Sequence, residues 1–247
     1  MAQRQSHRGQ HPEDARLFAE GRLPALRQSA ADLSFLFSRD YAQDAALKLV
    51  GDHYQLDVRQ RRAILRGACS EESLRHRTST QVPNHGLPGS PVAIDGYNLL
   101  ITVESALSGG VLLRGRDGCV RDMASIHGSY HKVEETIPAI RLIGATLQEL
   151  RIANSTWFFD SPVSNSGRLK ALLVREAEQH GWNVAVEVIN HVDQILSSRE
   201  EIVITSDSWI LDRVARWATI TDHILRQAAA QARVIDLASH LLRDGEV

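Results

Sequence analysis

The chain has 247 residues, of which 43% are hydrophobic and 23% are charged, and its formal net charge is −2. Such a composition suits a globular protein with one large core or two modest ones. Its apolar runs fall far short of the roughly 20 residues that span a bilayer, and the start MAQRQSHRGQHPED lacks the apolar run of a signal peptide, so we expect a cytoplasmic protein that enters no membrane.

Cysteine content and charge distribution narrow the function classes. Cys69 and Cys119 lie in what we expect to be different domains, which argues against a disulfide framework and against a cysteine zinc site. Residues 1–77 carry 13 Lys and Arg against 10 Asp and Glu, whereas the remainder carries 15 against 20. A mildly basic half beside an acidic half is compatible with a phosphate-bearing substrate that one half holds and the other cuts.

The first third of the chain predicts a tail, a helical domain and a linker. Residues 1–12 are polar and basic without apolar periodicity, and we expect them to be disordered. Apolar residues then recur every three or four positions from Leu23 to Phe37, as on one helix face. Within an all-α domain over 13–75 we expect four helices: one before Pro24, and others over 26–38, 42–54 and 57–70, the last capped by Asp57. Residues 76–91, rich in Pro, Gly, Ser and Thr, are predicted to be the interdomain linker.

A basic stripe marks the last predicted helix of this domain. Arg59, Arg62 and Arg66 are spaced at i, i+3 and i+7, so they lie on one face. The stripe is a candidate for gripping a phosphate backbone. Alternatively, it pairs with acidic residues of the other domain or is simply solvated.

From residue 92 to 247 the pattern is of alternating short apolar strands and amphipathic helices, typical of βαβ units and a parallel sheet. We therefore predict the α/β class, with a doubly wound, mainly parallel sheet of about five strands. The expected strands cover 92–95, 155–160, 183–189, 201–207 and 233–238. The expected helices cover 97–108, 133–150, 168–180, a short stretch from 193, and 208–217, while 221–225 fits a strand or a helix. A glycine-rich loop is expected over 109–128.

Three of the predicted strands end on an aspartate, namely Asp95, Asp160 and Asp207. Asp193 begins the helix before the last of these strands. The carboxyl ends of parallel strands line one crevice, so we expect the four carboxylates to converge there. Each would raise the pKa of the others, and a hard divalent cation, Mg²⁺ or Mn²⁺, is the simplest occupant. For Asp160 and Asp193 the alternative is that they only cap local structure.

The motifs IDGYN at 94–98, FFD at Asp160, VDQIL at Asp193 and ITSD at Asp207 together resemble, in order and spacing, those of PIN-like and NYN nuclease domains. The chain as a whole resembles an uncharacterised prokaryotic family with an all-α domain before such a domain, here 92–247. The resemblance implies a metal-dependent nuclease, in most relatives a ribonuclease, with nucleic acid as partner. It makes the four aspartates catalytic metal ligands, Asp95 and Asp207 foremost.

Further residues join the candidate site. Glu104 lies where PIN-like proteins often have an acidic residue, the alternative being a solvated helix face. Asp122 is a second candidate ligand, whereas Asp117 with Gly118 is typical of a turn. We expect Asn98 to contact substrate or to tether Asp95. The stretch SNSGRLK opens a helix, where free N–H groups and nearby cations favour a phosphate. Its candidate substrate-binding residues are Ser164, Ser166, Arg168 and Lys170, and the alternative is an ordinary helix cap.

Several points stay open at this stage. His127 and His131 flank Tyr130, but with 11 histidines in the chain we leave both out of the catalytic set. The main rival function is a catalytically inactive module of the same fold that binds RNA or a protein. Another is a different Mg²⁺-dependent phosphotransfer enzyme, although FFDSP lacks the second aspartate of a haloacid-dehalogenase-like phosphatase. The sequence leaves the oligomeric state open, a homo-oligomer included.

Overall fold

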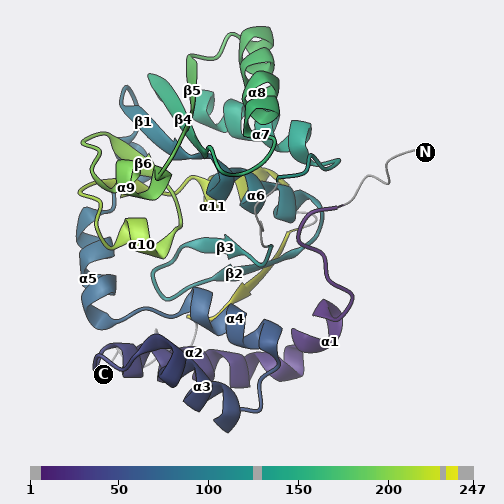
Figure 1. Cartoon of the computed structure of the whole chain (residues 1–247), viewed down its shortest axis with the longest axis vertical. Helices are drawn as coiled ribbons and strands as arrows, with labels where there is room; N and C mark the ends of the chain where they lie inside the picture. Colours follow the sequence, from purple (N-terminus) through teal and green to yellow (C-terminus); the bar gives the residue numbers. More distant parts are fainter. Residues whose placement is uncertain (1–6, 125–129, 229–231, 239–247) are drawn as a thin grey trace.

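In the computed structural model, which describes residues 7–124, 130–228 and 232–238, five parallel strands form the main sheet (Figure 1). β1 (Pro91–Asp95) pairs with β4 (Asn154–Asp160) on one side and with β6 (Ile202–Ile204) on the other. β5 (Val184–Ile189) and β7 (Trp217–Ala218) form the two edges. The predicted α/β class and sheet of five parallel strands are confirmed. The chain adds strands first on one side of β1 and then on the other, which creates a switch point between β1 and β6.

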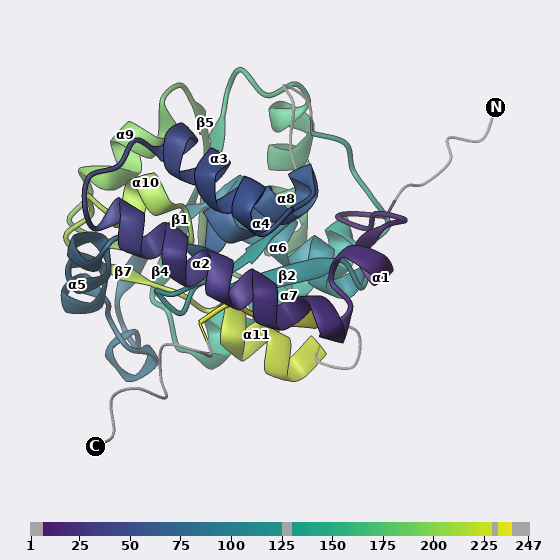
Figure 2. The same cartoon turned by 90° about the horizontal axis from the view of Figure 1, so that it is seen from below.

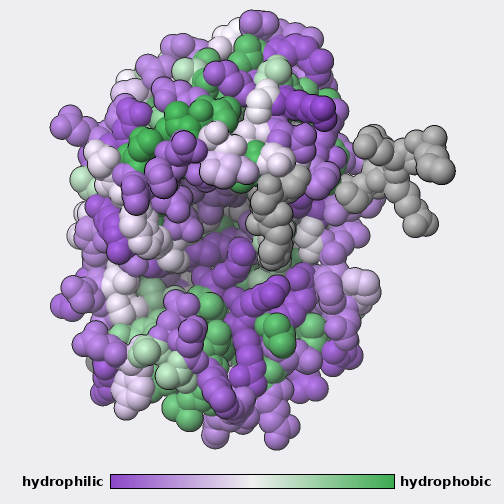
Figure 3. Space-filling model, viewed as in Figure 1, coloured by the Kyte–Doolittle hydropathy of each residue, from purple (hydrophilic) through white to green (hydrophobic). Residues whose placement is uncertain are grey.

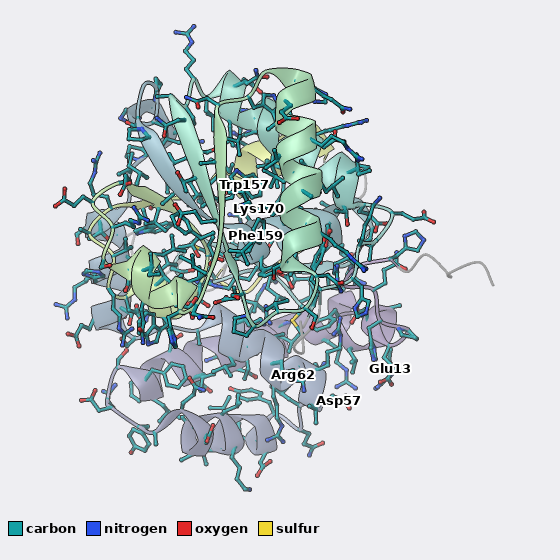
Figure 4. The ribbon with its side chains drawn as sticks, turned by 45° about the horizontal axis from the view of Figure 1, so that its top comes forward. Glu13, Asp57, Arg62, Trp157, Phe159 and Lys170 are labelled. Carbon is teal, nitrogen blue, oxygen red and sulfur yellow. The ribbon has the colours of Figure 1, made fainter. Side chains whose placement is uncertain are left out.

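The central strands are apolar on both faces because helices cover both sides of the sheet. Successive side chains alternate between the faces. Trp157 and Phe159, labelled in Figure 4, enter one core together with Ile94, whereas Ala93 and Phe158 enter the other. The first face is covered by α6 (Gly96–Leu107), α7 (Thr136–Glu149), α8 (Ser166–His180) and α11 (Thr221–Ala228), and the second by α9 (Val192–Ser197) and α10 (Ser208–Leu211).

A second, smaller sheet lies below the main one (Figure 1). β2 (Val111–Arg114) pairs antiparallel with β3 (Val120–Asp122) and parallel with β8 (Arg233–Asp236). The glycine-rich stretch predicted as a loop thus contains a hairpin, and the last predicted strand joins this sheet rather than the main one. The predicted turn at Asp117 and Gly118 connects the hairpin, with Gly118 at φ +77°.

The N-terminal part is helical, as expected. Its helices are α1 (Asp14–Leu17), α2 (Leu23–Phe37), α3 (Gln43–His53), α4 (Val58–Gly67) and α5 (Glu71–Thr80). Asp57 is the N-cap of α4, and its N–H donates to the Gln60 side chain at 3.0 Å. No helix in the described ranges is both long and apolar enough to cross a membrane.

The helical part shares its core with the second sheet. Leu26 and Leu33 of α2 and Ile64 of α4 pack in one cluster with Leu113 and Ile235 of that sheet. The opposite face of the same sheet packs against α6 and α11. Seen from below, α2, α3 and α4 lie across the molecule in front of the sheets (Figure 2). The helices therefore form a layer of the fold rather than the separate domain that we predicted.

Two segments predicted to be irregular are part of the packed structure. The stretch predicted as a linker, 76–91, contains the end of α5, the buried residues Arg77 and Leu87, and a hydrogen bond from the Val82 N–H to the Trp217 carbonyl at 2.7 Å. In the predicted tail, residues 1–6 lie outside the described ranges. Arg8, however, pairs with Glu104 of α6 at 2.7 Å. In the described part of the tail, Arg8 is thus held against the fold by an ion pair.

Candidate functional site

Four aspartates lie at the carboxyl edge of the main sheet. Asp95 and Asp160 are the last residues of β1 and β4. Asp193 lies in the first turn of α9, which follows β5, and Asp207 is the N-cap of α10, which follows β6. Because these strands are parallel, their ends meet at one edge, on both sides of the switch point. The neighbouring carboxylates are close enough to raise the pKa values of Asp95 and Asp193, as described below.

Asp95 is the most strongly perturbed member of the set. The residue is only 8% exposed, and burial raises the pKa of its carboxyl group to about 7, with Asp207 and Asp193 adding to the rise. Two hydrogen bonds act in the opposite direction: the Thr205 hydroxyl donates at 2.8 Å and the Asn98 N–H at 3.4 Å. These two hydrogen bonds do not offset the effect of desolvation on the pKa of Asp95. Without a cation, the site holds this carboxyl group partly protonated at neutral pH.

Asp207 has one committed oxygen and one available oxygen. Its Oδ1 accepts from the backbone N–H groups of Trp209 at 2.8 Å and Ile210 at 3.2 Å, as an N-cap does. Within the described ranges, Oδ2 has no hydrogen-bond donor. Oδ2 is therefore available to a ligand.

Asn98 fixes the loop that carries Asp207. Its side-chain oxygen accepts from the Ser206 N–H at 2.8 Å and from the Ser206 hydroxyl at 2.9 Å. This joins the start of α6 to the turn after β6. Of the two roles expected for Asn98, the structure shows a tether: its side chain holds the Asp207 loop, and its backbone N–H donates to Asp95.

Two buried arginines hold the same loop from below, and neither was singled out from the sequence. Arg121 donates to the Ser206 carbonyl at 2.7 Å, and Arg77 to the Ser208 carbonyl at 3.3 Å. Both arginines also pair with Asp117, at 2.6 Å each. Burial alone would favour the neutral acid, but Arg121 and Arg77 hold the pKa of Asp117 at about 2. Asp117 is thus a structural anion as well as a turn residue.

Asp160 and Asp193 line a cleft of about 620 Å³, together with His191 and Trp209. Asp160 accepts from the Val192 N–H at 3.4 Å. Although Asp193 lies at the surface, desolvation by the cleft walls raises the pKa of its carboxyl group, and Asp207 and Asp160 raise it further. Asp160 therefore holds the start of α9 through Val192, whereas Asp193 accepts no hydrogen bond from the described residues, and both belong to the acidic cluster.

A larger cleft of about 1000 Å³ lies between the helical part and the main sheet, and Asp207, Asp122 and Arg66 line it. Figure 3 shows a hollow with hydrophilic walls in the middle of this face. Burial raises the pKa of Asp122, whereas Arg66 lowers it. Both carboxylate oxygens of Asp122 are engaged, one by the Thr102 hydroxyl at 3.0 Å and one by the Ala124 N–H at 2.8 Å. Asp122 is therefore a poor candidate for a metal ligand.

The structure does not bring Glu104 to the aspartates. This residue is fully buried and lines neither cleft. Arg8 donates to its carboxylate at 2.7 Å and Thr136 at 2.6 Å, and the Tyr130 hydroxyl donates as well. Burial raises the pKa of Glu104, and these donors oppose the rise. In the structure, Glu104 of α6 has a structural role instead of the predicted role as a metal ligand.

The predicted phosphate site at the start of α8 is only partly available. The Ser166 hydroxyl is buried between the carbonyl oxygens of Asp160 and Val163 and the Tyr97 hydroxyl. It is committed to the loop and is a poor ligand for substrate. Ser164, Arg168 and Lys170 are exposed. Of the histidines, His127 lies outside the described residues, and His131 is exposed.

The three arginines of the predicted basic stripe have different surroundings. Arg59 forms a two-pronged pair with Asp14, at 2.5 and 2.9 Å. Arg66 donates to the carbonyl oxygens of Asp122 at 2.7 Å and Ala124 at 3.2 Å while lining the large cleft. Arg62 is exposed on the helical part, in the region of Figure 4 where Asp57 and Glu13 are labelled. Only Arg66 reaches a cleft that also contains one of the four aspartates.

The acidic cluster offers oxygen ligands without enclosing an ion. Over 7–124, 130–228 and 232–238, no three His, Cys, Asp or Glu side chains converge tightly enough to hold a metal by themselves. Asp207 keeps one free oxygen, Asp160 keeps one, and Asp193 has no hydrogen-bond donor among the described residues. Such a donor set suits a hard cation that keeps several waters, as Mg²⁺ does.

Comparison with known proteins divides the chain at the predicted linker. The family model described as "Domain of unknown function (DUF5616)" matches residues 84–223, and that described as "Protein of unknown function (DUF434)" matches residues 25–79. An uncharacterized protein of Methanocaldococcus jannaschii is 27% identical over 187 residues, which are 76% of this chain and 89% of that protein. No solved structure matches. All four aspartates fall in the first matched segment, and the three arginines of the stripe fall in the second.

Proposed function

We propose that this chain, which belongs to the family described as Domain of unknown function (DUF5616), hydrolyses phosphodiester bonds with Mg²⁺ or Mn²⁺ bound at its aspartate cluster. The bond that breaks joins phosphorus to a bridging oxygen, and the attacking group is water. A carboxylate-bound cation supplies two things in such a site: it stabilises charge on the phosphate oxygens and lowers the pKa of a water molecule.

The observation that carries the proposal is the state of Asp95. A buried carboxyl group at a switch point, with two further carboxylates raising its pKa, is electrostatically unfavourable unless a proton or a cation compensates. Strongly perturbed acids gather at functional sites more often than elsewhere. A bound cation would favour the ionised forms of Asp95 and Asp193 together, and the free oxygens of Asp160, Asp193 and Asp207 would hold it.

A PIN-like fold is part of the proposal. From edge to edge, the parallel strands of the main sheet follow the order 3-2-1-4-5 when they are renumbered along the chain. This doubly wound order, with acids at the ends of strands one, two and four, supports the PIN-like assignment made from the motifs. The preference for RNA over DNA rests on the resemblance alone.

The rival function is a catalytically inactive module that binds RNA or a protein through the same face. The observation in its favour is that, among the described residues, the acids do not enclose an ion by themselves. The observation against it is the set of unpaired carboxylate oxygens, because a surface that binds an anionic strand gains nothing from adjacent anions.

The test is a cleavage assay with the purified full chain. Labelled single-stranded RNA and DNA are incubated with Mg²⁺, Mn²⁺ or a chelator, and the variants are Asp95→Asn and Asp207→Asn. Asp44→Asn is the matched control, because Asp44 is an exposed acid on α3. We expect metal-dependent cutting by the wild type and the control, and at least a hundredfold loss in the other two variants.

Thermal unfolding provides the second readout. A cation that binds only the folded chain raises its stability, by about 2.7 kcal/mol at a hundred times its Kd. We expect Mn²⁺ to raise the Tm of the wild type and to leave that of Asp207→Asn nearly unchanged. Cutting that survives both active-site substitutions would contradict the site. No cutting together with no metal-dependent rise in Tm would favour the binding module.

A further inference from the structure

Trp209 presents a large aromatic surface to solvent at the acidic cluster. The residue is 41% exposed, whereas Trp157 and Trp217 are buried in the two cores of the main sheet. A tryptophan side chain normally contributes its area to a core or an interface. An indole that remains exposed beside a candidate active site therefore suggests a ligand surface.

Trp209 lies next to Asp207 at the start of α10. Its backbone N–H donates to the Asp207 carboxylate at 2.8 Å, because Asp207 is the N-cap of this helix. Trp209 also lines the smaller cleft with Asp160 and Asp193. Trp209 thus shares a cleft with two of the four aspartates and a helix start with a third.

A cation lies over the indole. The Arg213 guanidinium is 4.0 Å from the centroid of the Trp209 ring, and it donates to the Trp209 carbonyl at 2.9 Å. Both side chains are exposed at their surfaces. Together they form an aromatic platform with a positive charge next to the negative cluster. An aromatic ring that offers stacking, with a guanidinium beside it for phosphate, is the combination that single-stranded nucleic acids use.

α10 forms the wall between the two clefts. Asp207 and Ser208 line the larger cleft, and Trp209 lines the smaller one. α9 and α10 lie side by side under the carboxyl edge of the main sheet (Figure 1). A strand that crosses this wall has a phosphate near Asp207 when one of its bases reaches Trp209.

We propose that Trp209 stacks against an unpaired base next to the phosphate that is cut, so that the substrate is a single-stranded nucleic acid. This inference rests on the proposed function, since it names the substrate class of the same site. A base inside a duplex already stacks on its neighbours and cannot offer its face. An unpaired base offers its face whatever its identity, so the platform selects for single strands without selecting a sequence.

The experiment measures binding in chelator, separately from cutting. An unstructured, labelled RNA of ten nucleotides and a blunt duplex of the same sequence are titrated with the full chain and with Trp209→Ala, Trp209→Leu and Trp209→Phe. The leucine variant keeps apolar bulk in α10 if alanine impairs folding. Phe35→Ala is the matched control, because Phe35 is 54% exposed with the Arg39 guanidinium 3.5 Å from its ring centroid, far from the aspartates in sequence.

We expect Trp209→Ala and Trp209→Leu to weaken binding of the single strand about 5- to 150-fold, as for other stacking aromatics. Trp209→Phe and Phe35→Ala are expected to bind like the wild type, and the duplex is expected to bind more weakly than the single strand. Equal binding by wild type and Trp209→Leu, tighter binding of the duplex, or no binding of either would overturn the inference. Binding that depends on Trp209 without any metal-dependent cutting would instead overturn the proposed nuclease and leave the stacking site standing.

Discussion

Asp95 gives the chain a measurable pH signature. Its pKa is about 7 in the folded protein against an ordinary value of 3.8, so the folded state keeps this proton to a higher pH than the unfolded state does. The contribution of the protonated Asp95 to the free energy of unfolding is therefore complete below about pH 4. It is lost as the pH rises from about 4 through 7, because the unfolded state then releases the proton first. At pH 8 the ionised form costs at most about 4 kcal/mol.

We therefore predict that Asp95→Asn is more stable than the wild type at pH 8 in chelator, and that the difference disappears near pH 4. Asparagine keeps the shape of the side chain but cannot ionise. Urea unfolding at the two pH values checks this, with Asp44→Asn as the control for the loss of one exposed negative charge. If the two proteins differed in unfolding free energy by the same amount at pH 4 and pH 8, the pKa of Asp95 would not be raised in the folded protein.

Glu104 and Asp207 make opposite predictions, although both were expected to be metal ligands. Removing the Glu104 carboxylate leaves the buried Tyr130 and Thr136 hydroxyls and Arg8 without their acceptor. We expect Glu104→Ala to lower the unfolding free energy by roughly 2–4 kcal/mol while the Mn²⁺-induced rise in Tm persists. Asp207→Asn should keep most of the stability and lose the Mn²⁺ response. Differential scanning fluorimetry with and without Mn²⁺ separates the two, and loss of the response in both variants would restore Glu104 to the site.

At the scale of elements, the hairpin of β2 and β3 positions the Asp207 loop through Arg121. Replacing Arg121 by methionine leaves Asp117 buried with Arg77 as its remaining cationic partner and frees the Ser206 carbonyl. We expect a loss of about 3–5 kcal/mol and a fall in cutting. The control on the same hairpin is Arg114→Met. Arg114 pairs with Asp222, and both side chains are about a third exposed, so the loss there should stay below about 1 kcal/mol. Similar losses in both variants would contradict this role of Arg121.

The elements that the sequence predicted well are those with long apolar runs. β1, β4 and β5 have five to seven residues and lie inside or at the side of the main sheet. β2, β3 and β7 have only two to four residues, and their pattern is hidden by neighbouring glycines or by a helical spacing such as that of 208–217. A short strand is defined by its partners, and one of the two partners of β2 lies more than a hundred residues away in β8.

The candidate site, like the fold, could be predicted from the sequence only in part. Aspartates at strand ends could be predicted because strand direction alone brings them to one edge. The place of Glu104 could not, because its position on α6 does not reveal that Arg8 and Tyr130 surround it. The apolar face of α2 is visible in the sequence, but the sheet that it packs against is not.

For the whole molecule, the shared core predicts a single unfolding unit. Leu26, Leu33 and Ile64 of the helical part pack in one cluster with residues of β2 and β8. These two strands lie far apart in the chain, and both follow the helical part. We expect one cooperative transition by calorimetry. We also expect residues 84–223, produced alone, to expose the apolar face of β2 and to aggregate. Two separate transitions in the full chain, or a stable and soluble fragment, would contradict a shared core.

The position of β8 also determines when the protein can fold during synthesis. β8 is the third strand of the sheet on which the first helices pack, and a side chain at Gly67 of α4 would collide with Leu237, which follows that strand. The helices emerge from the ribosome well before β8, yet their core is completed only by Ile235 and Leu237. The helical layer must therefore remain incompletely packed until these residues have been synthesised, in contrast to the usual order in which N-terminal units fold first.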